Sequence, residues 1–249
     1  MKILGILSLL LTLAVSTVKN CNENHYYGDD GDTTCTAKVE MFNKINTKGV
    51  ATIYFTQGDE LNIDIEGDKR SVENLNLQVY NGTLYISDKI NIKGRTYQRL
   101  NLYITAPDLE DVWMNGVGSF NVNENLNLNH NLGFHSAGVG AVNINSLSCG
   151  NAYFHNNGVG SFTINHCECG DINIVQGGVG SIKMTDLNAH DVKLNNCGVG
   201  SVKVNTKCRN IDINASGVGS TTVTGTTENY TLDKKGIGSV NLSELSTAK

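Results

Sequence analysis

One tetrapeptide, Gly-Val-Gly-Ser, recurs through the C-terminal half of the chain and constrains the fold more than any other feature. Successive copies begin 22, 20, 20, 20, 19 and 19 residues apart, and only Ala141 and Ile237 depart from the consensus. A fixed period in this range is typical of a solenoid, in which each repeat forms one turn. The first glycines of the seven copies are Gly116, Gly138, Gly158, Gly178, Gly198, Gly217 and Gly236, and the second are Gly118, Gly140, Gly160, Gly180, Gly200, Gly219 and Gly238.

Each copy is flanked by two stretches that alternate between apolar and polar residues. Four and six residues after the first glycine stand apolar pairs such as Phe162 and Ile164, which are separated by a polar residue. Six and four residues before the next glycine stand pairs such as Ile172 and Ile174. Alternation of this kind predicts half-buried strands, so each period reads as strand, glycine bend, strand and polar bend.

Coiling the chain is the economical way to bury these apolar faces, because each coil can lie about 4.8 Å above the previous one and bond to it in parallel. The sequence therefore predicts an all-β protein, a single-stranded right-handed parallel β-helix (solenoid) with coils of about 20 residues. The right hand follows from strand twist and the crossover rule.

The tetrapeptide itself supports two expectations. Its middle residue is valine or isoleucine in all seven copies, and we expect it to form an inward-pointing column. The glycines are expected to allow a bend that a Cβ would forbid, through a positive φ or through close approach to the neighbouring coil. A phosphate-binding role is not favoured, because that motif occurs once, between a strand and a helix.

The N-terminal residues predict an exported protein. Lys2 precedes an apolar run that is too short to span a bilayer, and Ala14-Val15-Ser16 has the small residues of a cleavage site, so residues 1–16 read as a signal peptide. We expect a periplasmic, outer-membrane-associated or extracellular location. A lipid anchor at Cys21 is the disfavoured alternative, because Lys19 and Asn20 separate this cysteine from the apolar run.

Composition and patterning organise the rest of the chain. Residues 17–36 are polar and glycine-rich, which predicts a flexible leader, and residues 37–249 are expected to form one β-helix domain with a short C-terminal tail. Asn81-Gly82 is a strong hairpin or turn signal inside the first, irregular coils. The net charge of −5 without a basic stripe argues against a nucleic-acid partner.

Several motifs resemble a known family. Phe42 to Asp59 resembles its opening, Asn81-Gly82-Thr83-Leu84-Tyr85-Ile86 its second motif, and Leu102 to Leu109 its third, before the repeated Gly-x-Gly-Ser blocks. The chain is similar to the putative auto-transporter adhesin head (GIN-type) family, a domain of unknown function from exported proteins of Bacteroidetes-like bacteria, over about residues 39–242. The resemblance implies an exported right-handed β-helix without established catalytic residues. The Tyr-x-Gly-x-Pro strand that often ends family members is missing here.

Candidate chemistry is sparse. The column seven residues before each glycine reads Asn131, Asn151, Asp171, Asp191, Asn210 and Asn229, and it is expected to be a hydrogen-bonded surface ladder. Asp171 and Asp191 lie one coil apart, so a polysaccharide lyase or hydrolase that uses both is the alternative. No column of arginine or lysine accompanies them. His135, Tyr153 and His155 are candidates for an exposed ligand patch, because an aromatic face can bind a sugar ring.

The seven cysteines are expected to be structural. Cys21 and Cys35 bracket the leader and are candidates for a disulfide in an oxidising compartment. Cys167-x-Cys169 lies near His166, but zinc sites use wider spacings, and we expect the two thiols to face opposite sides of the strand. We expect no metal and no cofactor. The pairing of the remaining thiols stays open: Cys149, Cys167, Cys169, Cys197 and Cys208.

Three functions remain. We favour a non-catalytic exported adhesin that binds a glycan or a cell-surface protein. The polysaccharide-degrading enzyme and a purely structural spacer are the alternatives. We expect a monomer or a weak end-to-end dimer, with the tail after Leu242 folded across the last coil so that Leu245 covers its apolar column.

Overall fold

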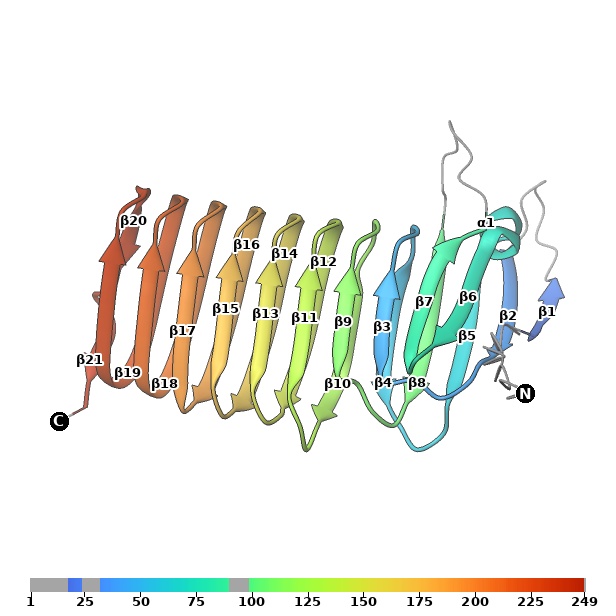
Figure 1. Cartoon of the computed structure of the whole chain (residues 1–249), viewed down its shortest axis with the longest axis horizontal. Helices are drawn as coiled ribbons and strands as arrows, with labels where there is room; N and C mark the ends of the chain where they lie inside the picture. The colour runs from blue at the N-terminus through green and yellow to red at the C-terminus, as the bar shows by residue number, and fades with distance from the viewer. Residues whose placement is uncertain (1–17, 24–31, 90–98, 249) are drawn as a thin grey trace, which may run out of the picture.

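The computed structural model describes residues 18–23, 32–89 and 99–248, with side chains from residue 33 onward. The predicted signal peptide lies outside the described residues. The protein is an elongated β-solenoid whose strands stack along one axis, from the blue N-terminal end to the red C-terminal end in Figure 1. The predicted all-β parallel solenoid is confirmed, since most strands pair in parallel with the strand one coil away.

Two ladders of parallel strands build the solenoid, one on each side of the glycine bend. The first ladder contains β4 (Thr52–Gln57), β10 (Phe120–Asn127), β12 (Val139–Ser148), β14 (Val159–Cys169), β16 (Val179–Ala189), the beginnings of β18 (Val199–Ala215) and β19 (Val218–Lys234), and β20 (Ile237–Asn241). The second ladder contains β3 (Lys44–Thr47), β9 (Asp111–Met114), β11 (Leu132–Ser136), β13 (Ala152–Asn156), β15 (Ile172–Gln176), β17 (Asp191–Asn196) and the ends of β18 and β19.

The core lies between the two ladders and consists of the predicted alternating residues. Phe162 and Ile164 of the first ladder and Ile172 and Ile174 of the second are each at most 2% exposed. Equivalent positions stack from coil to coil; Ile172, for example, lies opposite Ala152 on one side and Val192 on the other. Each fully buried aliphatic side chain contributes about 1.5–3 kcal/mol, so these columns are the main stabilising element.

The prediction that the middle residue of the tetrapeptide points inward is wrong. The valines are about half exposed, for example Val179 at 50%, and Ile237 is 83% exposed. The reason is that strand alternation continues through the bend. Positions two before the first glycine and four after it face inward, as buried Gln176 and Ile182 show. Residues an odd number of positions from the glycine therefore face outward, and the valine is one of them.

Both expectations for the glycines are confirmed. Gly180 has a φ of +144°, a region that residues with a Cβ rarely adopt. A Cβ on Gly178 would collide with the carbonyl oxygen of Gly158 and lie 2.7 Å from the carbonyl carbon of Asn157, both in the preceding coil. Glycine is thus needed at these inward-facing positions because two bends approach each other too closely for any side chain.

The N-terminal end differs from the expected series of irregular coils. β3 and β4 form a regular coil around Gly49 and Val50, and this coil stacks directly on β9 and β10. The intervening chain lies at the outer end of the stack. It contains β5 (Asn62–Asp68), α1 (Lys69–Asn74), β6 (Leu75–Tyr80), β7 (Thr83–Asp88) and β8 (Leu100–Ala106).

Part of the expected irregular coil is present, because β7 and β8 pair in parallel with β3 and β4 and continue the stack. Antiparallel pairs then close the N-terminal end. β5 pairs antiparallel with β8, and β6 pairs with β7 across the predicted Asn81-Gly82 turn, in which both residues have positive φ values of 48° and 70°. α1 is short, and no helix among the described residues is long and apolar enough to cross a bilayer.

The predicted leader contains two strands, which differs from the flexible segment expected there. β2 (Asp32–Lys38) pairs antiparallel with β5, and β1 (Val18–Glu23) pairs antiparallel with β2. Cys35 is 4% exposed and takes part in a disulfide, and the register of β1 and β2 places the backbone of Cys21 directly opposite it. Alternating residues of β2, such as Cys35 and Ala37, join the core, which is why this polar stretch is a strand.

The C-terminal end also differs from the expectation. The tail does not cross the last coil; instead β21 (Leu245–Thr247) continues the stack by pairing in parallel with Gly225 to Thr227 of β19. Leu245 packs against the core as expected, at the end of the column that runs through Leu187, Thr206 and Gly225. Tyr230 and Leu232 stay 49% and 43% exposed, because no described strand pairs with the outer edge of this part of β19. The last coil is therefore open where the tail was expected to cover it.

Candidate functional site

A groove runs along the outer face of the second ladder. It has a volume of about 530 Å³ and lies between two columns of outward side chains. One column contains Tyr153, Asn173, Lys193, Asp212 and Thr231, and the other contains Asp171, Asp191, Asn210 and Asn229. The alternating residues between them, such as Val192, point into the core. We call this surface the ladder groove; each coil contributes one residue to either wall.

The predicted asparagine ladder is confirmed as one wall of the groove. The backbone N–H of Asp171 donates to Asn151 Oδ1 at 2.9 Å, and Asn229 Nδ2 donates to Asn210 Oδ1 at 3.0 Å. Asn210 Nδ2 in turn donates to Asp191 Oδ1 at 2.8 Å. Hydrogen bonds thus link the ladder in two runs, from Asn131 to Asp171 and from Asp191 to Asn229, and hold the polar groups within each run in a fixed row.

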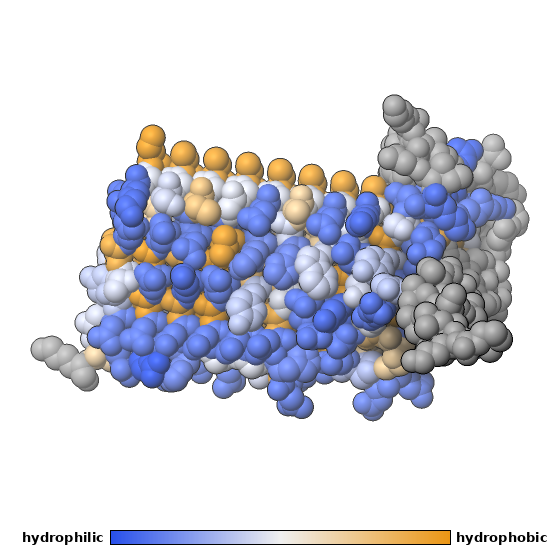
Figure 2. Space-filling model, viewed as in Figure 1, coloured by the Kyte–Doolittle hydropathy of each residue, from blue (hydrophilic) through white to orange (hydrophobic). Residues whose placement is uncertain are grey.

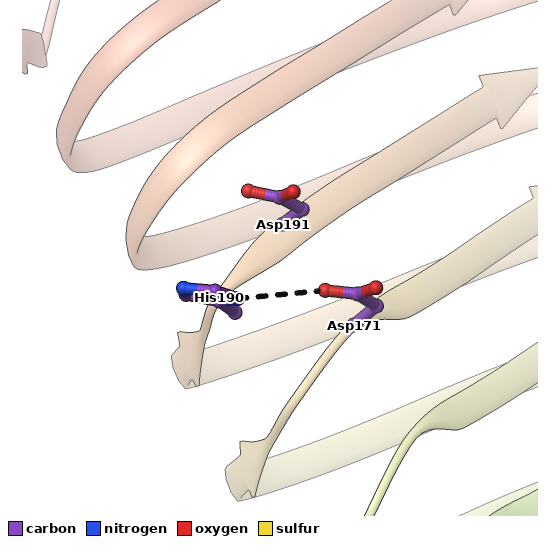
Figure 3. A group of neighbouring side chains, drawn as sticks. All are labelled: Asp171, His190 and Asp191. Carbon is purple, nitrogen blue, oxygen red and sulfur yellow. Dashed lines mark ion pairs between the residues drawn. The ribbon is translucent and has the colours of Figure 1, made fainter.

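Asp171, His190 and Asp191 meet at the polar bend beside the groove (Figure 3). One oxygen of each carboxylate and one ring nitrogen of His190 lie within 4.8 Å of one another, and His190 Nδ1 is 3.9 Å from Asp171 Oδ1. These are the three described side chains closest to a cation-binding arrangement. The two aspartates come together as the spacing of the coils predicts.

Arg209 forms an ion pair with Asp191 and sets the protonation behaviour of its carboxylate. Its Nη2 and Nε donate to the two carboxylate oxygens at 2.8 Å and 3.2 Å. These bonds, together with the one from Asn210, hold the pKa of Asp191 below its usual range. The repeat contains no arginine column, yet Arg209 reaches Asp191 from the next coil. A general acid needs a raised pKa, so Asp191 does not have the electrostatics of a general acid.

The three residues of the predicted ligand patch lie on one face but in two groups. Tyr153 is 39% exposed at one end of the ladder groove. His135 and His155 lie opposite each other on β11 and β13, two residues along from Tyr153, and belong to an aromatic row. Trp113 stacks on His135 at 5.7 Å between ring centroids, and His135 meets His155 edge-on at 5.3 Å. Burial, then the neighbouring His135, lowers the pKa of His155.

The free thiols are those of Cys149, Cys167, Cys169, Cys197 and Cys208. Cys167 replaces a leucine in the core, as predicted, with Leu147 and Leu187 on either side. Its Sγ lies 3.9 Å from Cys169 Sγ, so the expectation that these thiols face opposite sides is wrong. Residues two apart on a strand share a face, which brings the thiols together. Burial raises the pKa of Cys149 to about 12, so its thiol is unreactive.

Sequence reasoning missed the second wall of the groove and two of its charges. Lys193 and Asp212 stand five residues before their glycines, in the same column as Tyr153. That column could have been predicted from the repeat, because all its members lie five residues before a tetrapeptide glycine. Arg209 was not readable in this way, since it lies in the polar bend, where coil lengths vary between 19 and 20 residues.

The sequence matches the model of the family described as "Putative auto-transporter adhesin, head GIN domain" over residues 41–209. The chain belongs to this family. The matched region holds β3 to β17 and the first part of β18, and it includes Tyr153, Lys193 and Arg209 of the groove. The resemblance seen in the sequence motifs is therefore confirmed. No match was found among curated protein sequences.

Solved structures of the same architecture agree with the family. A protein described as a putative adhesin from Bacteroides fragilis is 29% identical, with a TM-score of 0.77 over 84% of this chain and 96% of that one. Another from Parabacteroides distasonis is 18% identical, with a TM-score of 0.64 over 86% and 98%. A protein from the same species described as a putative lipid binding protein is 16% identical, with a TM-score of 0.63 over 86% and 97%. The last two show the fold alone.

Proposed function

We propose that this member of the GIN family is an exported, non-catalytic adhesin that binds a glycan of a cell surface through the ladder groove. The observation that carries the proposal is the groove itself, a channel of about 530 Å³ with an exposed tyrosine at one end. Amide, carboxylate and ammonium groups along its walls match the hydroxyls of a carbohydrate, and Tyr153 offers a ring face for a sugar.

The repeat makes the groove run parallel to the solenoid axis. On the Asn/Asp wall, similar polar groups recur once per coil, about 4.8 Å apart, so a linear glycan lying along the solenoid axis would meet a similar partner there at each coil. The ladder hydrogen bonds hold these partners in place before binding, which lowers the entropic cost of ordering them. A linear chain of sugars is therefore the ligand that suits the groove best.

Binding to a glycan array is the test of this proposal. We expect the purified protein to bind selected glycans, and Tyr153→Ala and Lys193→Ala to weaken that binding more than about tenfold. Tyr80→Ala is the matched control, because Tyr80 is similarly exposed at 49% but lies on β6, outside the groove. Binding to cell-surface proteins alone would replace the glycan with a protein partner. Binding to neither would favour the structural spacer.

The enzymatic alternative has its own test. The protein is incubated with uronic-acid and neutral polysaccharides, and we expect no product, because Arg209 and Asn210 already engage Asp191. Release of product that disappears when Asp171→Asn and Asp191→Asn are combined would contradict the non-catalytic proposal.

Export is supported by the N-terminal sequence and by the disulfide at Cys35, since disulfides persist in oxidising compartments. We expect the mature protein to begin after residue 16 and non-reducing peptide mapping to link Cys35 to Cys21. A lipid found on Cys21 would instead establish the anchored form.

A further inference from the structure

A row of aliphatic side chains stands on the outside of the glycine bends. The valines of the row are 49–51% exposed, and Ile237 is 83% exposed. Figure 2 shows a line of hydrophobic residues along one long edge of the molecule, above mostly hydrophilic faces. We call this row the valine ridge, and its members are Val117, Val139, Val159, Val179, Val199, Val218 and Ile237. Scattered exposed valines need no explanation, but a continuous row marks an interaction surface.

The interior of the bend prevents the ridge from turning inward. Beneath it lie buried amides, where Asn156 Nδ2 donates to Gln176 Oε1 at 2.9 Å and to the carbonyl oxygen of Gly160 at 3.2 Å. Asn156 and Gln176 are both fully buried. The bend therefore places polar groups inside and apolar groups outside, the reverse of the arrangement that would stabilise a monomer most.

A second groove runs beside the ridge. Its floor is the column of glycines from Gly49 to Gly178, and one wall is Val50 and the ridge as far as Val179. The other wall is formed by residues such as Ala137 and Asn157, with Lys48 and Asp88 at the N-terminal end of the groove. Its volume is about 710 Å³. The first six tetrapeptides, each with the residue before it, contain no charged residue. This edge thus has a row of protruding aliphatic side chains next to a parallel groove, and both repeat once per coil.

We propose that the valine ridge is a self-association surface on which a second copy of this chain docks, its ridge lying in the groove beside the first ridge. The ridge side chains of a second copy repeat once per coil and match the coils of the groove between Val117 and Val179, which a partner without this spacing cannot do. A two-fold axis near Val179, the middle residue of the ridge, would place the C-terminal half of each ridge, from Val179 to Ile237, in the other copy's groove.

The charge and the exposed area of this edge are consistent with a second copy of the chain as the partner. An anionic lipid surface or a charged protein would need rows of basic or acidic groups along the edge. The first six bends carry none, and the charged residues that line the groove are Lys48 and Asp88, at its N-terminal end. At about 60–120 Å² for each aliphatic side chain, seven half-exposed members give about 200–400 Å² per copy. The two ridges together therefore bury about 400–800 Å², less than the roughly 1,000 Å² of a stable interface, which is why we expect a weak dimer.

Docking through the ridge leaves the ladder groove free. The ridge lies eight residues along the strand from the Asn/Asp ladder, or roughly 25 Å of extended chain. A dimer would present two ladder grooves, and bivalent binding would strengthen weak attachment to a repeating surface. The dimer does not depend on the proposed glycan binding, so either can fail alone.

Sedimentation of the full-length protein tests the proposal. We expect reversible dimers in the high-micromolar range, and Val179→Asp should weaken dimerisation at least about tenfold because two carboxylates would meet near the two-fold axis. Val175→Asp is the matched control, because Val175 faces outward on β15 of the same coil but outside the ridge. Circular dichroism melting confirms that both variants fold.

Three results would overturn the proposal. The protein could remain monomeric at every concentration, or Val175→Asp could weaken association as much as Val179→Asp. As a third result, the protein could bind neutral phosphatidylcholine vesicles through the ridge, and float with them, without self-associating. That result would assign the ridge to a lipid surface.

Discussion

Replacing Gly178 with alanine should destabilise the solenoid far more than the same change at its neighbour Gly177. The Cβ of the new side chain at position 178 would collide with the carbonyl oxygen of Gly158 and lie 2.7 Å from the carbonyl carbon of Asn157. Both are backbone atoms, and Gly158 accepts a 2.9 Å hydrogen bond from the N–H of Val179, so the coil cannot retreat without breaking the ladder. At Gly177 the Cβ would meet mainly the tip of the Asn157 side chain, which can rotate away.

The expected magnitude follows from these contacts. Overpacking costs about 1–3 kcal/mol, and one weakened backbone hydrogen bond adds about 1 kcal/mol. Gly178→Ala should therefore lower the free energy of unfolding by about 2–4 kcal/mol. For a domain of this size that corresponds to a fall in Tm of about 4–16 °C.

Thermal melting followed by circular dichroism measures the difference. We expect Gly177→Ala to melt close to the wild-type protein and Gly178→Ala to melt several degrees lower. Equal melting temperatures for the two variants would refute the close approach of the bends, because the substitutions are chemically identical and differ only in the backbone beside them.

Two further predictions concern the direction and the charge of side chains. Val179→Asp should change the free energy of unfolding of the monomer by no more than about 0.5 kcal/mol, because this side chain faces outward. Val202→Asp should prevent folding, because Val202 is 1% exposed and the change would bury an unpaired charge. Chemical denaturation at low protein concentration compares the two variants. Arg209→Ala should raise the pKa of Asp191 toward its ordinary value, with Lys207→Ala as the control, as followed by NMR titration. The pair stabilises the fold above that ordinary value and loses its effect as the pH falls through the lower folded pKa. An unchanged Asp191 pKa would contradict the assigned contact.

The repeat alone predicts the central part of this structure. Equal offsets from the glycines placed Ile172 beside Val192 and Asn210 beside Asn229, and the ladders contain these pairs. This works because a solenoid converts a sequence period directly into contacts between neighbouring coils. The asparagine ladder, one wall of the groove, was predictable for the same reason.

The direction of the tetrapeptide valine was misjudged because hydrophobicity was weighed above alternation. Counting inward positions through the bend, from Gln176 to Ile182, places Val179 outside. The buried amide of Gln176 occupies the space beneath the bend, and a polar residue at an inward position is difficult to recognise without seeing its hydrogen bond to the Gly178 carbonyl at 3.2 Å.

The ends of the solenoid were the least predictable parts. The repeat does not extend to residues 58–110, and nothing in their spacing shows that β3 and β4 stack on β9 and β10 while the chain between them closes the end. The contact of Arg209 with Asp191 could not be predicted for a similar reason, because Arg209 lies in a bend of variable length.

The claim that the ladder groove binds a linear glycan is tested most directly by NMR of the isotopically labelled protein titrated with the best glycan from the array. We predict that the backbone amide signals that shift belong to residues around Tyr153, Asn173, Lys193 and Thr231, while those of the valine ridge stay in place. Shifts confined to the ridge or to the open last coil, or no shifts at all, would contradict the claim.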